Sequence, residues 1–295
     1  MSAADESATD SSVPLLVRLR GIRPSLSPAE DRVAERVLAD PGAAADLTIS
    51  ELATAADTSE TTVLRFCRRL GLRGYPQLRL RLAEASVQPR LAKAQDTDIS
   101  AKDTIADIVA KVAFADSSAV EETAQQLDHD ALAAAAQAIG SAKRVDIYGI
   151  AASAIVGIDL QQKLHRIGVV AFVWNDPHIA LTSATLLGKG DVAIGLSHSG
   201  TTKETIEALE AAQSRGATTV AITNFPVSPL ASKADLVLST AARETSLRSG
   251  ATASRIAALT VVDCLYLAVA QRNLSRARKA VQETRDAVSS HHVRT

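Results

Sequence analysis

The chain has 295 residues, which is long for one domain and enough for two. Hydrophobic residues make up 46% of it but aromatic residues only 3%, so its cores must be built from Ala, Leu, Val and Ile, as in helical and α/β proteins. The formal net charge of -1 hides an uneven distribution, because residues 61–81 contain six arginines and no acidic residue. This local excess of positive charge indicates an anionic partner.

Cysteine spacing and hydropathy exclude several classes of protein. Cys67 and Cys264 lie far apart, without Cys or His at metal-ligand spacing, so we expect no zinc site, no disulfide framework and no cofactor. No run of about eighteen apolar residues is present, so we expect no membrane span. Residues 1–12 are polar and acidic and lack the basic start and apolar core of a signal peptide. We therefore expect a disordered tail over residues 1–14 and a cytoplasmic protein.

Helix-start signals organise the N-terminal part of the chain. Two capping boxes, Ser27 to Glu30 and Thr48 to Glu51, each mark the start of a helix, and Ser59 marks a third start. Apolar residues recur at helical spacing behind these starts. The helices that we expect are 28–40, 49–56, 59–70 and 77–85, with turns near 41–42 and 74–76. Together they predict an all-α domain over residues 15–86.

The pattern fades over residues 87–103, where we place a linker, and a different pattern follows. Helical periodicity covers 104–127 and 130–139, and beyond residue 140 short apolar runs alternate with helical stretches. The expected strands are 144–148, 169–173, 191–196, 218–223 and 236–239, and the expected helices are 152–166, 179–187, 203–215, 229–233 and 252–272. Five β-α repeats predict a three-layer α/β domain with a five-stranded parallel sheet over residues 104–275, followed by a charged tail over 276–295.

Two helices joined by a tight turn over residues 49–70 predict a helix-turn-helix. The second helix would be the recognition helix, whose N-terminal residues face base edges, and Arg65 could contact guanine through two hydrogen bonds. The other arginines would neutralise backbone phosphates. The residues expected to contact DNA are Ser59, Glu60, Thr61, Thr62, Arg65, Arg68, Arg69 and Arg73, with Arg79 and Arg81 as further phosphate contacts. The alternative is a solvated basic helix in an ordinary helical bundle.

This part of the chain resembles the N-terminal domain of RpiR-type regulators. The resemblance is carried by Leu52-Ala53, by the run from Ser59 to Gly71 and by Gly74-Tyr75. One departure is Asp57-Thr58 in the interhelical turn, where the family often has a glycine followed by a small apolar residue. Asp tolerates a left-handed backbone, so the turn is still expected. The resemblance implies double-stranded DNA as a partner, read by two copies of the domain.

A hydroxyl-rich loop is the strongest chemical motif of the C-terminal part. The loop, Ser197-His198-Ser199-Gly200-Thr201-Thr202, follows an expected strand and precedes an expected helix, a placement that suits a phosphate group. A second strand-end turn, Gly149 to Ser153, should converge on the same site. The spacing matches neither a dinucleotide fingerprint nor a P-loop nor a hydrolase nucleophile elbow. The alternative for these serines is helix capping alone.

Residues 143–269 resemble the sugar isomerase domain known as SIS. Matching pieces include 149–153, 164–168, 197–202, 222–224 and 250–257. The resemblance implies a phosphosugar ligand, phosphate contacts from part of these loops, and a second group of residues near the ligand or a dimer partner. The implied phosphate contacts are Ser153, Ser197, Ser199 and Thr202, with His198, Gly200 and Thr201 in the same loop, and the second group is Arg248, Ser254 and Arg255.

Isomerases with this domain need a general base near the substrate carbons that exchange the proton. Glu244 precedes the relevant stretch, but Arg248 occupies the position where amino-sugar isomerases place a glutamate. We therefore expect no enzyme but a phosphosugar-responsive transcriptional regulator, a repressor of sugar or amino-sugar catabolism genes that acts on a DNA operator as a homodimer or homotetramer. One alternative is a phosphosugar isomerase with an accessory basic domain. Another is a DNA-binding module with a vestigial sugar pocket.

Overall fold

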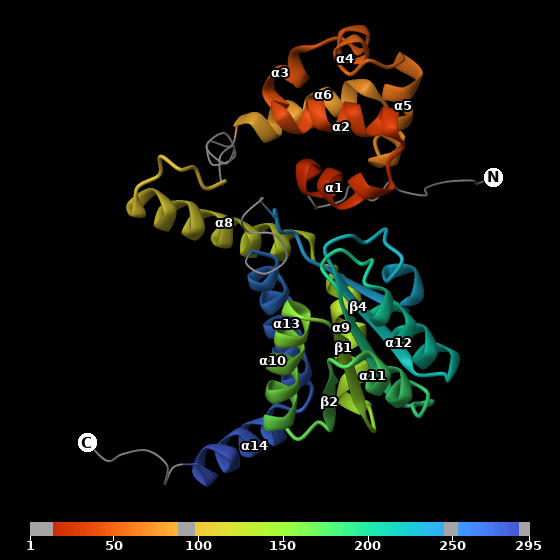
Figure 1. The fold of residues 1–295 in the computed structure, drawn as a ribbon, viewed down its shortest axis with the longest axis vertical. Helices are drawn as coiled ribbons and strands as arrows, with labels where there is room; N and C mark the ends of the chain where they lie inside the picture. The colour runs from red at the N-terminus through yellow and green to blue at the C-terminus, as the bar shows by residue number, and fades with distance from the viewer. Residues whose placement is uncertain (1–13, 88–97, 245–252, 289–295) are drawn as a thin grey trace, which may run out of the picture. The chain divides into compact units, whose positions relative to one another are not determined.

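The computed structural model describes residues 14–87, 98–244 and 253–288 (Figure 1). The chain divides into two compact units, residues 1–95 and 96–295. The expected N-terminal tail, most of the expected linker and the end of the expected C-terminal tail lie outside the described residues. The predicted fold class is confirmed, because the first unit is helical and the second contains a five-stranded parallel sheet.

The first unit packs its helices around one apolar core. Leu19, Val33, Leu52, Phe66 and Leu78 are fully buried in that core and come from five different helices. The helical elements are α1 (Leu15–Ile22), η1 (Arg23–Ser25), α2 (Pro28–Ala39), α3 (Pro41–Asp46), α4 (Ile49–Ala55), α5 (Glu60–Arg69) and α6 (Tyr75–Val87).

Both predicted capping boxes are confirmed and fix the starts of α2 and α4. The Ser27 N–H donates to Glu30 Oε2 at 2.9 Å, and the Thr48 N–H donates to Glu51 Oε2 at 2.7 Å. In return, the side-chain oxygens of Ser27 and Thr48 accept from the N–H groups of the two glutamates. Each box satisfies backbone donors that the first turn of a helix would otherwise leave unpaired.

The structure differs from the expected elements at three places in this unit. Helix α1 was not expected, because Pro14 precedes it without a side-chain cap. Asp40-Pro41 was expected only to end a helix, but it also starts α3, since the Asp40 side chain accepts from the Ala43 N–H at 2.9 Å. Helix α6 begins at Tyr75, in the segment expected to be a turn, with Pro76 in its first turn, where a missing N–H costs nothing.

The second unit begins with two helices, α8 (Ile105–Gln126) and α9 (His129–Ser141). The sheet follows, with strand order β2-β1-β3-β4-β5 and all neighbours parallel. Its strands are β1 (Val145–Gly149), β2 (Ala171–Trp174), β3 (Val192–Leu196), β4 (Thr218–Thr223) and β5 (Leu236–Ser239). The remaining helices are α10 (Ala152–Arg166), α11 (Pro177–Ala184), α12 (Lys203–Ser214), η3 (Ala231–Lys233), α13 (Ala253–Arg272) and α14 (Leu274–Ala287).

Helices cover both faces of the sheet, which makes the three predicted layers (Figure 1). Ile147 and Ile194 point to a core shared with α9, α10 and α13. Tyr148 and Ala193 point to a second core shared with α11 and α12. Because side chains alternate along a strand, a run buried on both faces must be apolar nearly throughout, as β3 is.

Among the described residues, one helix, α13, is long and apolar enough to cross a membrane by length and composition alone. In this structure it contacts α8, α9 and α10, and its Val261, Val262 and Leu265 are fully buried. The apolar character of α13 therefore follows from its central place in the helical layer.

Candidate functional site

The turn between α4 and α5 is held from outside by an arginine of α2. Asp57 has a left-handed backbone (φ 47°), as the sequence predicted for this position. Arg32 donates from Nε to the carbonyl of Ala56 at 3.1 Å and from Nη2 to the carbonyl of Asp57 at 2.6 Å. These bonds satisfy carbonyls at the end of α4 and connect the turn to α2.

Helix α5 buries one face and exposes the other. Ser59 caps it by accepting from the Thr62 N–H at 3.3 Å. Thr62 is only 8% exposed, and its hydroxyl lies 3.1 Å from that of Ser59, so the structure places it in the packed face and not beside the exposed Thr61. Glu60 is exposed but accepts a hydrogen bond from Ser50 of α4.

The arginines of this unit fall into two groups. Arg68, Arg69 and Arg73 are exposed, and their side chains have no hydrogen bond or ion pair with any residue in the described ranges. Arg79 instead donates to the carbonyl of Ala45 at 2.8 Å, and Arg81 pairs with Glu84 at 3.3 Å. The first group is therefore available to phosphates, whereas Arg79 and Arg81 also serve the unit's own structure.

The hydroxyl-rich loop of the second unit lies between β3 and α12. Ser197 Oγ and Thr202 Oγ1 hydrogen-bond at 2.9 Å, and Ser197 also accepts from the Gly200 N–H at 3.1 Å. Ser199 and Thr201 are joined by hydroxyls 2.8 Å apart. These bonds within the loop fix its shape, and its hydroxyls and backbone N–H groups surround the start of a helix, where an anion is favoured.

The left-handed turn at Gly200 (φ 66°) packs tightly against the neighbouring strand end. A Cβ atom at this position would lie 2.2 Å from Ser228 Oγ. The N–H of Leu230 donates to the carbonyl of Gly200 at 2.9 Å, which braces the loop from the segment after β4. Only glycine combines this backbone angle with this approach.

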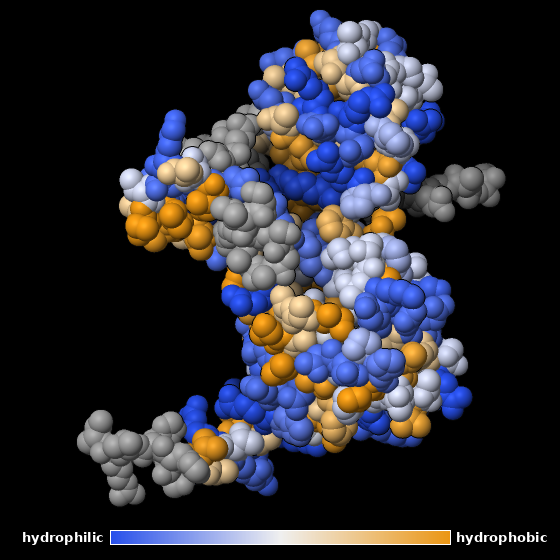
Figure 2. Space-filling view, viewed as in Figure 1, coloured by the Kyte–Doolittle hydropathy of each residue, from blue (hydrophilic) through white to orange (hydrophobic). Residues whose placement is uncertain are grey.

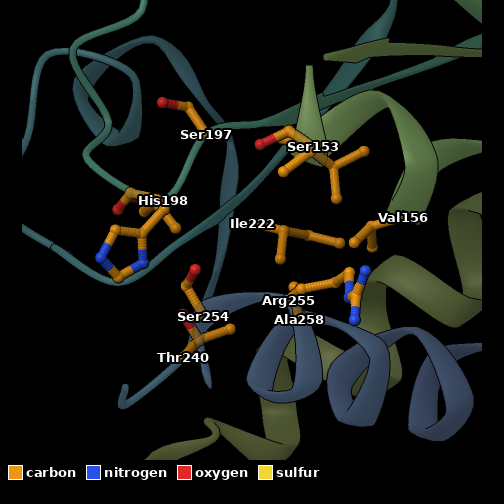
Figure 3. Close-up of a pocket in the computed structure, with 12 residues that line it drawn as sticks. Ser153, Val156, Ser197, His198, Ile222, Thr240, Ser254, Arg255 and Ala258 are labelled. Carbon is orange, nitrogen blue, oxygen red and sulfur yellow. The ribbon is translucent and has the colours of Figure 1, made fainter. Parts of the chain in front are cut away.

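A cavity that is open to solvent lies at the carboxyl ends of the strands, where ligands bind in open α/β sheets (Figure 3). Five of the predicted residues line it together, namely Ser153, Ser197, His198, Ser254 and Arg255. Their hydroxyls and ring approach from α10, the β3–α12 loop and α13, with Arg255 as the charged side chain of the lining.

The other predicted ligand residues lie elsewhere. Ser199, Gly200, Thr201 and Thr202 belong to the same loop but are not part of the cavity wall. Arg248 lies outside the described residues. The wall also contains Thr223 and Thr240, which were not predicted as site residues. Both stand at or just after the carboxyl end of a strand, where ligands bind in parallel α/β sheets, so this position could have identified them.

A histidine–glutamate pair stands at the rim of the cavity. His198 Nε2 lies 3.7 Å from Glu244 Oε1, and the His198 ring meets that of Phe225 edge-on at 5.7 Å. Both His198 Nδ1 and Glu244 Oε1 are buried without a hydrogen-bond partner among the described residues. Burial lowers the pKa of His198, and the nearby Glu244 carboxylate opposes that shift only in part. Burial therefore favours the neutral form of the imidazole.

Ala151 stands in a strained backbone conformation (φ 52°, ψ -120°) at the start of α10, two residues before Ser153. Such angles persist in a non-glycine residue only where the surroundings impose them, and they concentrate at ligand sites. The strain therefore indicates that the Gly149 to Ser153 turn, like the loop 197–202, is shaped for a ligand.

The chain matches two family models, one in each unit. The helix-turn-helix domain of the rpiR family matches residues 14–89, and the SIS domain matches residues 138–268. Over 279 residues the chain is 37% identical to an uncharacterized HTH-type transcriptional regulator of Caldanaerobacter subterraneus, which covers 95% of this chain and 98% of that protein.

Solved structures are similar over the same parts. The Vibrio vulnificus NanR protein, complexed with ManNAc-6P, is 33% identical with a TM-score of 0.60 and covers 95% of this chain and 100% of its own. The sugar isomerase domain of an RpiR transcription factor from Sphaerobacter thermophilus is 30% identical with a TM-score of 0.56 and covers 60% of this chain and 97% of its own.

Proposed function

The chain belongs to the RpiR family of HTH-type transcriptional regulators, and we propose that it binds a DNA operator through α4 and α5 and responds to a phosphosugar in its SIS domain. The observation that carries the proposal is the internally hydrogen-bonded loop 197–202, whose hydroxyls and helix start suit a phosphate without a strong cation. A protein that acts on chromosomal DNA works in the cytoplasm.

The proposed effector is a hexose, pentose or amino-sugar phosphate. NanR, a structural neighbour, holds ManNAc-6P, an amino-sugar phosphate, which supports this class. The cavity wall offers hydroxyls and one neutral imidazole beside the phosphate loop, groups that suit the hydroxyls of a sugar. We propose that the protein represses genes of sugar or amino-sugar catabolism until this ligand binds.

The working form in this proposal is a homodimer or a homotetramer. One small helix-turn-helix contacts too few base pairs for useful specificity, so two copies would read two half-sites. Ile105 and Val109, one turn apart on α8, are 77% and 63% exposed, and Figure 2 shows hydrophobic side chains gathered over this helix. A phosphosugar that favours one arrangement of the two copies by about 1–3 kcal/mol would change operator affinity about 5- to 150-fold.

A gel shift on the promoter region beside this gene, with a panel of sugar phosphates, tests the proposal. Ser197→Ala combined with Ser199→Ala should abolish the ligand response and leave DNA binding intact. The matched control is Ser214→Ala with Ser232→Ala, since both of those serines are exposed and bond only local carbonyls. A wild-type protein that binds no such DNA, or binds it without response to any ligand, would contradict the proposal.

A phosphosugar isomerase is the second candidate, and the His198–Glu244 pair favours it. A carboxylate and a neutral imidazole at a cavity rim are the groups that an acid–base isomerisation requires. Incubation with fructose 6-phosphate or an amino-sugar 6-phosphate, followed by product analysis, decides the matter. Turnover that Glu244→Gln abolishes would establish an enzyme.

A further inference from the structure

One buried carboxylate joins the start of α2 to the recognition helix. The Glu30 side chain is 2% exposed, and its Oε2 accepts from the Ser27 N–H at 2.9 Å and from Ser27 Oγ at 2.7 Å. Its other oxygen, Oε1, accepts from Arg65 Nε at 2.9 Å. Both carboxylate oxygens are therefore occupied, one by the capping box and one by an arginine 35 residues away.

The partner of this carboxylate faces outward. The Arg65 side chain is 56% exposed, and its Nη1 and Nη2 have no hydrogen bond with any residue in the described ranges. A guanidinium group is planar, so a bond at Nε fixes the plane of the two outer nitrogens. Those nitrogens form the fork that meets O6 and N7 of guanine in the major groove.

We infer that Glu30 is a positioning residue, which holds the outer fork of Arg65 ready for a guanine edge in the operator. The inference rests on the proposed DNA-binding function of α5. An arginine already fixed in its working rotamer loses less side-chain entropy when it binds, so the held fork should favour the correct base more than a mobile one.

The carboxylate stays charged in its buried place. Burial alone would raise the pKa of Glu30, but the hydrogen bonds from Ser27 and the ion pair with Arg65 outweigh burial and leave the pKa below its ordinary value. The ion pair between Glu30 and Arg65 therefore persists throughout the neutral pH range.

The second capping box supplies a matched control. Glu51 Oε2 accepts from both the N–H and the hydroxyl of Thr48, at 2.7 Å each, and Glu51 has no bond to an arginine of α5. Glutamine has a single acceptor oxygen. At position 51 that oxygen can keep both bonds, whereas at position 30 it cannot serve Ser27 and Arg65 together.

The experiment uses the full chain and a library of randomised DNA duplexes. Wild type, Glu30→Gln, Glu51→Gln and Arg65→Lys are each allowed to select sequences, and affinities are then measured for the selected duplex with individual guanines replaced by 7-deazaguanine, which lacks N7. Wild type and Glu51→Gln should lose affinity on the order of tenfold at one guanine. Glu30→Gln and Arg65→Lys should lose little there, because they no longer read it.

The outcomes separate the inference from the function on which it rests. If wild type selects no sequence, the proposed DNA-binding function fails. If wild type selects a motif and Glu30→Gln discriminates the same guanine as strongly, the positioning role fails and the function stands. A Glu30→Gln protein that loses affinity equally for all duplexes also overturns the inference. Should Glu30→Gln not fold, as judged by urea unfolding, Arg65→Lys decides, and retained guanine discrimination overturns the inference.

Discussion

The two units of this protein present opposite kinds of surface to the anions that we propose they bind. On the first unit, Arg68, Arg69 and Arg73 stand exposed without partners in the described part of the chain. On the second, the loop 197–202 has its hydroxyls paired with one another and with backbone N–H groups, and the cavity wall holds one arginine, Arg255. The first surface offers exposed charge, and the second offers hydrogen-bonding groups in a fixed arrangement.

The difference follows from the size of the partner. A DNA duplex presents a long row of phosphates, so independent charges gain affinity wherever they land near one. A single sugar phosphate must be held in one place and orientation to alter a conformational equilibrium, which needs donors fixed before the ligand arrives. Exposed charge therefore suits the proposed DNA-binding surface, and fixed hydrogen-bond donors suit the proposed phosphosugar pocket.

Ionic strength should separate the two surfaces most strongly. With about six phosphate contacts in the proposed dimer, operator affinity should fall on the order of 10³-fold between about 50 and 200 mM salt. Phosphosugar affinity should change by less than about threefold over that range, because the pocket relies on hydrogen bonds more than on net charge. Titrations of both ligands at several salt concentrations measure this. An equally steep loss of phosphosugar binding would contradict the comparison.

The contribution of a single arginine to this salt dependence can be measured. Arg73→Ala should flatten the logarithmic salt dependence of DNA binding by about 0.9 for each copy that contacts a phosphate. The matched control is Arg166→Ala, which removes an exposed arginine of α10 in the other unit. It should leave the slope unchanged, and a slope lowered equally by both substitutions would point to total charge instead of contacts.

A substitution at Gly200 should disrupt the geometry of the pocket. Gly200→Ala places a Cβ 2.2 Å from the buried Ser228 Oγ, in a backbone with φ 66°. The strained backbone and the overlap should together destabilise the second unit by about 2–4 kcal/mol and abolish the ligand response. Urea unfolding and thermal shift with sugar phosphates measure both effects.

Gly188→Ala is the control for that substitution. No atom lies within 4 Å of a Cβ added at Gly188, so stability should change by less than about 0.5 kcal/mol. If Gly200→Ala behaves like this control, the loop is softer than its hydrogen bonds indicate, and the contrast with the arginine surface weakens.

Local signals explain which parts of the fold were predictable. The predicted bounds of β4, β5 and α10 coincide with the observed ones, because each has an apolar pattern bounded by turn residues. The RpiR and SIS resemblances are confirmed. The start of α3 was not predicted, because the Asp40-Pro41 pair both ends α2 and caps α3. The sequence alone does not say whether such a pair ends a helix, starts one, or does both.

The parts of the site that were missed depend on contacts distant in sequence. The bond between Glu30 and Arg65 and the approach of Glu244 to His198 each join elements far apart in the chain. A loop's residue types predict its chemistry, but its neighbours are set by strand order and helix packing. Thr62 shows the same limit, since its burial depends on the rotation of α5 against the core.

Acidity should reveal the smallest difference between the two surfaces, since arginines do not titrate and His198 does. Burial lowers the pKa of His198 below its ordinary value of 6.5, so between the folded pKa and 6.5 the unfolded state binds more protons than the folded state. The stability of the second unit should therefore fall as pH drops from 6.5 through that window and stay level above it. Urea unfolding of wild type and His198→Asn across this range measures the effect.

Two histidine substitutions show whether His198 is the source of the acid-dependent decrease in stability. His198→Asn should lose the acid-dependent decrease, whereas His178→Asn, which changes an exposed histidine of α11, should keep it. If wild type instead gains stability on acidification, a protonated His198 must pair with Glu244 strongly enough to outweigh burial. The pocket would then carry a charge pair of its own, and its difference from the arginine surface would be one of degree.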